Sequence, residues 1–246
     1  MIEALLPQSL SGAAFVLLLA VSFGSSFLTA ALGIGGGVLM LGVLAMTLPP
    51  AALIPVHGLV QLGSNAGRAA LFLRHLHRPA LPGFLAGTLA GCALGGLVVV
   101  DLPPGAVQAG VGLFVLWSVL ARPPRWLVGA GWLGGGVSSV LTMFFGATGP
   151  FVATWVKSLS LPRHAHVATH AALMTVQHGV KTLVFGLLGF AFGPWMAVIA
   201  ALILAGLAGS WAGRLFLNRI SDLSFGRALN VVLVLIALRL IWQGLA

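Results

Sequence analysis

Long apolar runs, separated by short gaps that hold most of the charged residues, dominate the chain. A helix that crosses a bilayer needs roughly 20 mostly apolar residues, so this length accommodates about eight to ten membrane segments and no separate soluble domain. The runs that predict helical segments cover residues 10–32, 37–48, 52–73, 80–100 and 105–121, and then 127–145, 150–161, 166–187, 195–213 and 227–245. The expected fold is an all-α polytopic membrane protein.

The composition excludes a water-soluble fold. Of the 246 residues, 59% are hydrophobic and 6% are charged, with a mean hydropathy of +1.11, whereas soluble domains are about 25% charged. The net charge of +9 comes from 12 Lys and Arg against 3 Asp and Glu. Because the basic residues lie mostly in the gaps, they indicate membrane topology rather than a nucleic-acid partner. Cys92 is the single cysteine and cannot form an intrachain disulfide.

The chain contains two related halves. At an offset of 113 residues, the segment from Ser25 to Phe72 aligns without gaps with the segment from Ser138 to Phe185. Identical pairs include Ser25/Ser138, Ser26/Ser139, Thr29/Thr142, Gly33/Gly146, Gly36/Gly149, Pro49/Pro162, His57/His170 and Phe72/Phe185, and Arg68/Lys181 conserves charge. Pairs of these residue types are not expected by chance in an apolar sequence. The pattern predicts a duplicated unit, with halves at residues 1–122 and 123–246.

The charges in the gaps predict that the two halves cross the membrane in opposite senses. The basic gaps contain Arg74, Arg78, Arg122, Arg125, Lys157, Arg163, Arg214 and Arg219, and such residues are enriched in cytoplasmic loops. The gaps near 49–55, 101–105 and 187–194 contain no Lys or Arg. With five pieces per half, each basic gap corresponds to an uncharged one in the other half, which is typical of an inverted-topology repeat. Whether the first helix and the short arm after it make two crossings or a re-entrant hairpin stays open.

Two Gly-rich breaks, at residues 33–37 and 146–150, stand at equivalent places before the short arms. An interrupted helix exposes backbone N–H groups and a positive dipole end, and in inverted-repeat transporters such ends meet the substrate near the midplane. The candidate binding residues here are Gly35, Gly36, Gly37 and Gly149. The alternative is that these glycines only permit close helix packing, as we expect for the run Gly83, Gly87, Gly91 and Gly95.

Polar residues form a stripe on one face of each long central helix. The first stripe holds His57, Gln61, Ser64, Asn65, Arg68 and Phe72, and its repeat partner holds His170, Gln177, His178 and Lys181. Polar side chains at membrane depth are costly and usually face a cavity or a partner, so the two stripes predict a shared pathway. Snorkelling of Arg68 to the interface, and simple helix packing by the histidines, stay open as alternatives.

The helical rise per residue places Arg68 and His170 toward the cytoplasm and Lys181 and His57 toward the outside. We therefore expect two vestibules, each with one basic side chain and one histidine. The hydroxyl residues before the breaks either bind a ligand or satisfy carbonyls that the breaks free. They are Ser25, Ser26 and Thr29 in the first half and Ser138, Ser139 and Thr142 in the second.

The positions of the acidic residues predict the charge of the transported ligand. Glu3 is terminal and Asp101 and Asp222 are expected in loops, so no carboxylate is expected within the membrane. Cation pathways normally contain Asp or Glu, which makes an anion the expected cargo. The motifs at 75–77 and 164–166, each a pair of histidines two residues apart, are an incomplete ligand set for a metal. No catalytic motif is found, and neither a metal nor a cofactor is expected.

The Gly-rich segment at residues 33–37, followed by Leu48-Pro49-Pro50, and the two related hydrophobic halves resemble the sulfite exporter TauE/SafE family. The resemblance covers nearly the whole chain. It implies a multi-pass permease of the bacterial inner membrane for small sulfur-containing anions such as sulfite or organosulfonates. The second break departs from the family's triple-glycine pattern, since residues 147–150 read Ala-Thr-Gly-Pro.

The resulting hypothesis is a secondary transporter that moves sulfite or a sulfonate by alternating access between the halves. The expected partners are this anion and the lipid bilayer, and a second copy of the chain, in a homodimer, stays open. If protons are coupled, the histidines of the stripes are the side chains that titrate near physiological pH, with His178 the first choice. Alternatives are a non-transporting membrane subunit or assembly factor, and a metal-ion permease.

Overall fold

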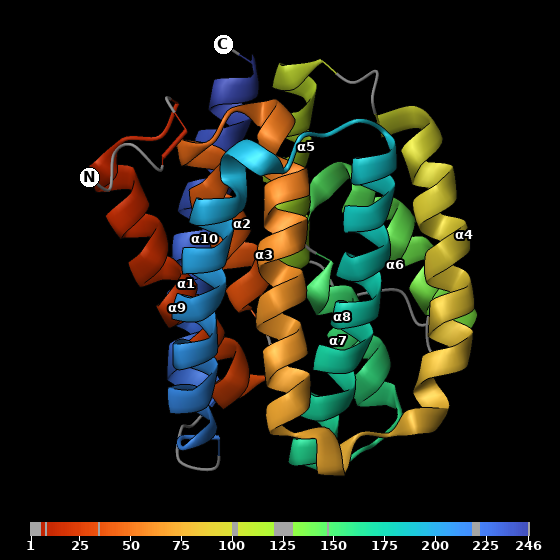
Figure 1. The fold of residues 1–246 in the computed structure, drawn as a ribbon. Helices are drawn as coiled ribbons and strands as arrows, with labels where there is room; N and C mark the ends of the chain where they lie inside the picture. The colour runs from red at the N-terminus through yellow and green to blue at the C-terminus, as the bar shows by residue number, and fades with distance from the viewer. Residues whose placement is uncertain are drawn as a thin grey trace.

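The computed structural model is a bundle of α-helices, shown in Figure 1. It describes residues 6–7, 9–33, 35–99, 103–120, 130–146, 148–217 and 222–245, among which there is no β-strand. The helices of the first half are α1 (Gly12–Leu32), α2 (Gly36–Thr47), α3 (Pro50–Leu71), α4 (Leu81–Val99) and α5 (Pro104–Leu120). Those of the second half are α6 (Gly131–Phe145), α7 (Gly149–Ser158), α8 (Arg163–Leu187), α9 (Met196–Arg214) and α10 (Asp222–Leu245). The all-α prediction is confirmed for these residues.

The helix boundaries follow the sequence repeat. The helices α2 and α7 begin at Gly36 and Gly149, and α3 and α8 begin at Pro50 and Arg163, in both cases 113 residues apart. In Figure 1, α3 runs from the upper end of the molecule to the lower end, whereas α8 runs from the lower end to the upper.

One expectation needs correction: Asp222 is the first residue of α10 and is not in a loop. Glu3, Ile34, Asp101, Ala147 and the expected boundary at 122/123 lie outside the described residues.

The breaks between α1 and α2 and between α6 and α7 depend on glycine. Gly33, Gly35 and Gly146 have φ values of 92°, 99° and 83°, which residues with a Cβ rarely adopt. A Cβ on Gly36 would overlap the carbonyl oxygen of Ser25. The arms that follow are 12 and 10 residues long, or about 18 Å and about 15 Å. Because a bilayer core is about 30 Å thick, neither arm crosses it alone, which favours the re-entrant hairpin.

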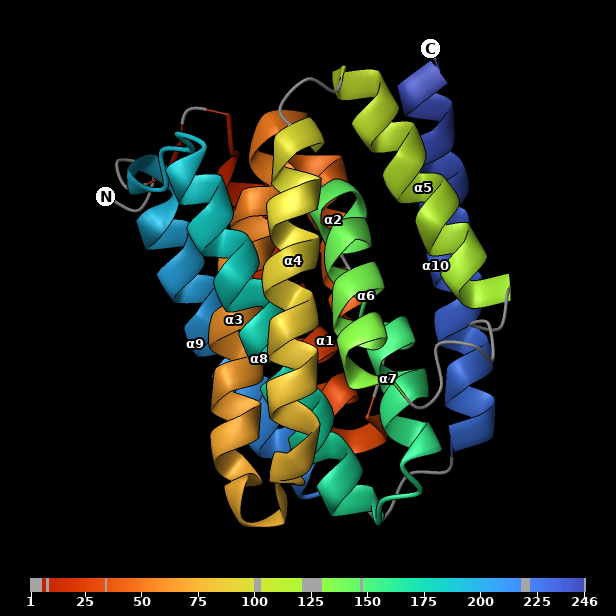
Figure 2. The same ribbon diagram turned by 90° about the vertical axis from the view of Figure 1, so that its right-hand side faces the viewer.

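Close contacts between helices of different halves hold the bundle together. The most extensive contacts join α1 with α9, α4 with α6, α5 with α10 and α3 with α8, and Figure 2 shows α4 beside α6 and α5 beside α10. A Cβ on Gly87 or Gly91 of α4 would overlap the carbonyl oxygen of Trp132 or Gly136 of α6. On α9, Gly209 and Gly213 meet α1 at the carbonyl oxygens of Phe23 and Phe27 in the same way. The expected role of the α4 glycines in packing is thus confirmed for Gly87 and Gly91.

The outer surface of the bundle is apolar. Within the described ranges, three helical segments are long and apolar enough to cross a membrane, namely Gly12–Leu32, Arg78–Val99 and Gly193–Arg214. Large side chains such as Leu97 and Trp242 are 77% and 75% exposed, as expected for residues that contact lipid. By contrast α3 and α8, which carry the polar stripes, pack against each other in the interior and bury those stripes.

The packing of α4 on α6 predicts different effects for two alanine substitutions at one interface. Gly87→Ala places a methyl group against backbone atoms of α6, whereas a Cβ on Gly136 meets its nearest atom, the Gly87 carbonyl oxygen, at an ordinary 3.6 Å. We expect Gly87→Ala to destabilise the protein by about 1–3 kcal/mol and Gly136→Ala to leave it unchanged or more stable. Thermal unfolding of both variants in detergent measures this. Equal melting temperatures would contradict the packing described here.

Candidate functional site

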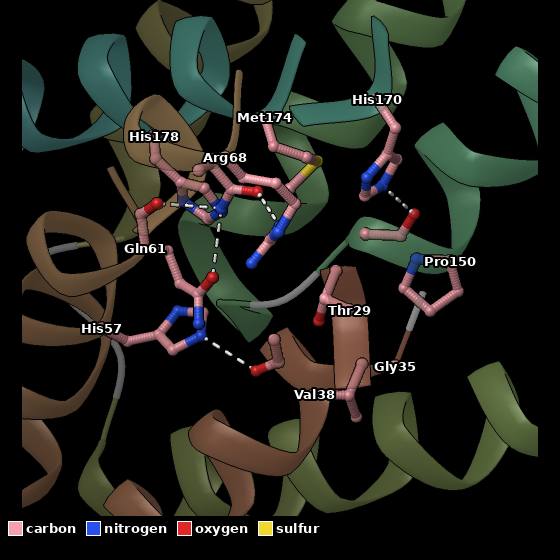
Figure 3. A pocket seen from close by; sticks show the side chains of 13 residues that line it. Thr29, Gly35, Val38, His57, Gln61, Arg68, Pro150, His170, Met174 and His178 are labelled. Atoms are coloured by element: carbon pink, nitrogen blue, oxygen red, sulfur yellow. Dashed lines mark hydrogen bonds between the residues drawn. The ribbon is translucent and has the colours of Figure 1, made fainter. Parts of the chain in front are cut away.

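A small cavity lies at the centre of the bundle, between the two halves (Figure 3). Its volume is about 30 Å³, which is enough for about two water molecules. The residues that line it come from α1, α2 and α3 of the first half and from α7 and α8 of the second. Ten of the predicted site residues are among them: Thr29, Gly35, Gly37, His57, Gln61, Asn65, Arg68, Gly149, His170 and His178. The structure therefore brings both stripes and both breaks to one place.

The N-termini of α2 and α7 reach this cavity from opposite halves. Gly35 and Gly37 line it at the start of α2, and Gly149 and Pro150 line it at the start of α7. Neither helix has a side-chain hydrogen bond from its N-cap residue. The first N–H groups of a helix, together with its dipole, favour negative charge. Two helix ends thus place positive partial charge at one cavity.

Arg68 is the cationic side chain of the cavity. It is only 2% exposed, which excludes snorkelling to the interface. Its Nη1 donates to Asn65 Oδ1 at 2.9 Å and its Nη2 to Ser64 Oγ at 3.4 Å, while its Nε is buried without a partner. Asn65 is held in turn by Gln61, whose Oε1 accepts from Asn65 Nδ2 at 3.1 Å. None of the chain's three acidic residues belongs to the lining segments. Among the residues that the structure describes, the partners of the guanidinium are neutral, so they orient it without compensating its charge.

The histidines of the two halves make matching hydrogen bonds. His57 Nε2 donates to the carbonyl oxygen of Gly37 at 3.1 Å, and His170 Nε2 donates to that of Gly149 at 3.1 Å. Each histidine therefore ties a long central helix to the first turn of the arm in its own half. The rings of His57 and His178 meet edge to face with centroids 5.7 Å apart, and the Nδ1 atoms of both are buried without a partner.

The remaining predicted residues lie behind the cavity wall, where they stabilise the breaks. Lys181 is fully buried, and its Nζ donates to Thr142 Oγ1 at 3.3 Å and to the Gly146 carbonyl oxygen at 3.0 Å. Gln177 Nε2 donates to Ser138 Oγ at 2.8 Å and to Ser139 Oγ at 3.1 Å, and its Oε1 accepts from Thr148 Oγ1. The backbone N–H of Gly36 donates to Thr29 Oγ1 at 3.1 Å. Lys181, Gln177, Thr142 and Gly36 are not among the lining residues.

One expectation about these groups needs correction. Arg68, His57 and His170 share one cavity and are not divided between two vestibules, and Lys181 is held at the second break. Of the two roles that the sequence left open for the hydroxyls, Thr142 takes the second, since it donates to the Gly146 carbonyl oxygen at the break. Ser25 and Ser138 instead donate to carbonyl oxygens inside their own helices, Ser22 O and Gly134 O. Thr29 donates to the carbonyl oxygen of Ser25 and also lines the cavity.

Three lining residues, Val38, Pro150 and Met174, were not predicted as site residues. Met174 lies four residues after His170 and four before His178 on α8, so the helical spacing alone placed it on the same face. Because Met174 is apolar, like most of the chain, its residue type did not mark it as a binding residue. Val38 is the third residue of α2, and its position could be found only once the break before α2 was placed.

The two His-x-His motifs meet across the halves at the lower end of the bundle. The rings of His75 and His164 lie 5.2 Å apart. Among the described residues, no group of three or more His, Cys, Asp or Glu side chains is placed to hold a metal ion. The pair is therefore a contact between the halves and lacks the ligand set of a metal site.

The family model described as sulfite exporter TauE/SafE matches residues 18–240, nearly the whole chain. No curated protein and no solved structure shows significant similarity to the chain.

The uncompensated charge of Arg68 predicts an unusual effect on stability. A buried cation without a counter-ion is costly. In anion-poor buffer, Arg68→Met should therefore raise the free energy of unfolding by roughly 1 kcal/mol or more, and with it the melting temperature. Arg74→Met is the matched control, because Arg74 is exposed near the lower end of α3. Thermal unfolding in detergent gives both values. A lower melting temperature for Arg68→Met than for the wild type would show that the arginine is a stabilising structural group.

Proposed function

The chain belongs to the sulfite exporter TauE/SafE family, a family of membrane transporters, and from this we propose that it is a secondary transporter for a small sulfur-containing anion. The cargo we propose is sulfite or an organosulfonate, and the location is the inner membrane, crossed several times. The observation that carries the proposal is Arg68, a buried cation that lines a cavity between two helix N-termini and has no counter-ion in the described part of the chain.

The hydrogen-bond donors around the cavity are suited to binding an anion. A ligand oxygen can accept from the free Nε of Arg68 and from the N–H groups of Gly37 at the start of α2 and Gly149 at the start of α7. The neighbouring positions offer no further donor there, because Gly36 N donates to Thr29, Pro150 has no N–H and Phe151 N donates to Thr148 O. In an apolar interior these charge-assisted bonds are strong, because water does not compete for them. An anion would also compensate the charge that the protein leaves unpaired. The site thus suits a ligand that brings negative charge and several acceptor oxygens.

The size of the cavity favours a compact ligand. About 30 Å³ is room for about two water molecules, which fits an oxyanion of a few atoms such as sulfite. A sulfonate presents a similar group of three oxygens on sulfur, but its organic part needs space outside this cavity. Sulfite is therefore the first choice of cargo.

Alternating access is supported by the position of the cavity between the halves. Its wall is built from α2 and α3 on one side and α7 and α8 on the other, and the paired helices α3 and α8 run in opposite directions (Figure 1). We propose an inverted-topology repeat in which movement of one half against the other exposes the cavity to each side in turn. Export of an anion can be driven by an interior-negative potential, worth about 2.3 kcal/mol per charge per 100 mV, without a coupled ion.

Sulfite flux in proteoliposomes tests the proposal. Purified protein should raise sulfite or sulfonate flux well above that of empty vesicles, and Arg68→Gln should reduce it about ten- to hundredfold, because a hydrogen bond to a charged group contributes about 1.5–3 kcal/mol. Arg74→Gln, which removes an exposed charge, should change the flux less than twofold. Wild-type flux no greater than in empty vesicles across a panel of such anions would refute the proposal. A stoichiometric partner that co-purifies with a protein lacking flux would instead favour the membrane-subunit alternative.

A further inference from the structure

Basic side chains of α8 bind the carbonyl ends of both helices that stop at a glycine break. At the end of α1, Arg163 Nη2 donates to the carbonyl oxygen of Ala31 at 3.0 Å. At the end of α6, Lys181 Nζ donates to the carbonyl oxygen of Gly146 at 3.0 Å and to Thr142 Oγ1 at 3.3 Å. The last carbonyl groups of a helix have no partner within it and form the negative end of the helix dipole. Each interrupted helix therefore ends at a cation that α8 supplies.

The two cations do not come from equivalent positions of the repeat. The repeat equivalent of Arg163 is Pro50, and that of Lys181 is Arg68, which lines the central cavity. Duplication of one unit therefore does not explain why both interrupted helices end at a basic side chain. The shared arrangement indicates a requirement that both breaks have in common.

The place of the Lys181 ammonium group is closely fitted. The side chain is fully buried, and a Cβ on Gly58 of α3 would lie only 2.9 Å from Lys181 Cε. Ala171 stands at the equivalent position of α8, so the second half does not need glycine where the first half does. In the described part of the chain, the hydrogen-bond partners of Nζ are the neutral oxygens of Thr142 and Gly146.

Neutral oxygens at the end of an interrupted helix are a known kind of cation site. In inverted-repeat transporters, unwound backbone carbonyls and the C-terminal ends of half-helices coordinate the coupling sodium ion or proton. Here the Gly146 carbonyl oxygen, in the buried interior, binds an ammonium group, and the Ala31 carbonyl oxygen binds a guanidinium group. Both positions that would suit a coupling cation thus already hold a positive charge.

We infer that Lys181 and Arg163 are built-in cations that take the place of coupling cations, so that the chain moves its anion without sodium or potassium. The inference rests on the proposed function. Both charges are covalently attached to α8 and stay at the breaks when the anion is released, whereas a bound sodium ion would leave with it. Each cycle therefore moves the charge of the anion alone, on which the membrane potential acts.

Replacement of the monovalent cation tests the first consequence. Sulfite flux through the wild-type protein is measured in proteoliposomes with sodium, potassium or choline as the added cation, at one sulfite gradient and with the membrane potential collapsed by a lipophilic ion. The three fluxes should agree within about twofold, because no site waits for a small cation. A flux that falls about tenfold or more in choline would overturn the inference and leave the transport function standing.

Chemical rescue tests the role of the ammonium group. Lys181→Ala removes three carbons and the ammonium group, which together correspond to propylammonium, and should lower flux at least about tenfold. Added propylammonium should restore flux at least about threefold, whereas 1-propanol, which has the same length and no charge, should not. The matched control is Lys157→Ala, which removes an exposed lysine of α7 and should change flux less than about twofold. Unchanged flux in Lys181→Ala, or equal rescue by 1-propanol, would overturn the inference.

The same design applies to the other break. Arg163→Ala should lose flux and regain it with N-ethylguanidinium, which corresponds to the part of the arginine side chain that alanine lacks. Flux within about twofold of the wild type in Arg163→Ala would remove the guanidinium from the proposed pair and overturn the inference in this form.

Thermal unfolding separates failure of the cation site from failure of the transport function. If the wild type carries no flux for any anion tested, the proposed function fails, and melting temperatures are compared in sulfite-free detergent. Propylammonium should raise the melting temperature of Lys181→Ala by several degrees, because a ligand that binds the folded state stabilises it, and should leave the wild type and Lys157→Ala unchanged. Equal shifts in all three proteins would overturn the inference. If Lys181→Ala does not fold, Lys181→Met keeps a side chain of similar length without the charge, and wild-type flux in that variant would likewise overturn it.

Discussion

A buried guanidinium group, with no carboxylate beside it among the residues that the structure describes, is the constraint on which the rest of the structure depends. Such a charge is tolerated only where neutral donors and acceptors surround it and where a ligand can supply the missing negative charge. Asn65 and Ser64 hold the Arg68 head group in place, and Gln61 holds Asn65. Its Nε has no partner, and Arg68 lines a cavity that two helix N-termini also reach. On the proposed function, the polar interior is arranged to hold an anion that the chain itself does not provide.

The glycine breaks follow from the same requirement. A continuous helix would satisfy its own N–H groups and would present none to a ligand. Gly33, Gly35 and Gly146 take positive φ values that end one helix and allow the next to start at cavity depth. In the second half Lys181 binds the Gly146 carbonyl oxygen, which this break leaves in the interior. The basic residues at equivalent positions of the two halves thus have different roles: Arg68 lines the cavity, and Lys181 stabilises a break.

Much of this arrangement could be predicted from the sequence, because it is encoded locally. The 113-residue offset located the starts of α2 and α7 to within one residue, and helical spacing placed His57, Asn65 and Arg68 on one face. The direction in which Lys181 points could not be predicted, because it depends on the position of α6 relative to α8. The contact between His75 and His164 is likewise a tertiary feature that spacing within one motif cannot reveal. Apolar lining residues such as Met174 carry no chemical signal in a chain that is apolar almost throughout.

The central claim is that the cavity beside Arg68 binds the transported oxyanion. An experimental structure of the protein soaked with selenite, an analogue of sulfite with an anomalous scatterer in place of sulfur, tests it most directly. The account predicts one strong anomalous peak in the central cavity, with selenite oxygens within hydrogen-bond distance of Arg68 Nε and of first-turn N–H groups of α2 or α7. A peak confined to another part of the protein, or an empty central cavity at selenite concentrations that compete with sulfite flux, would contradict it.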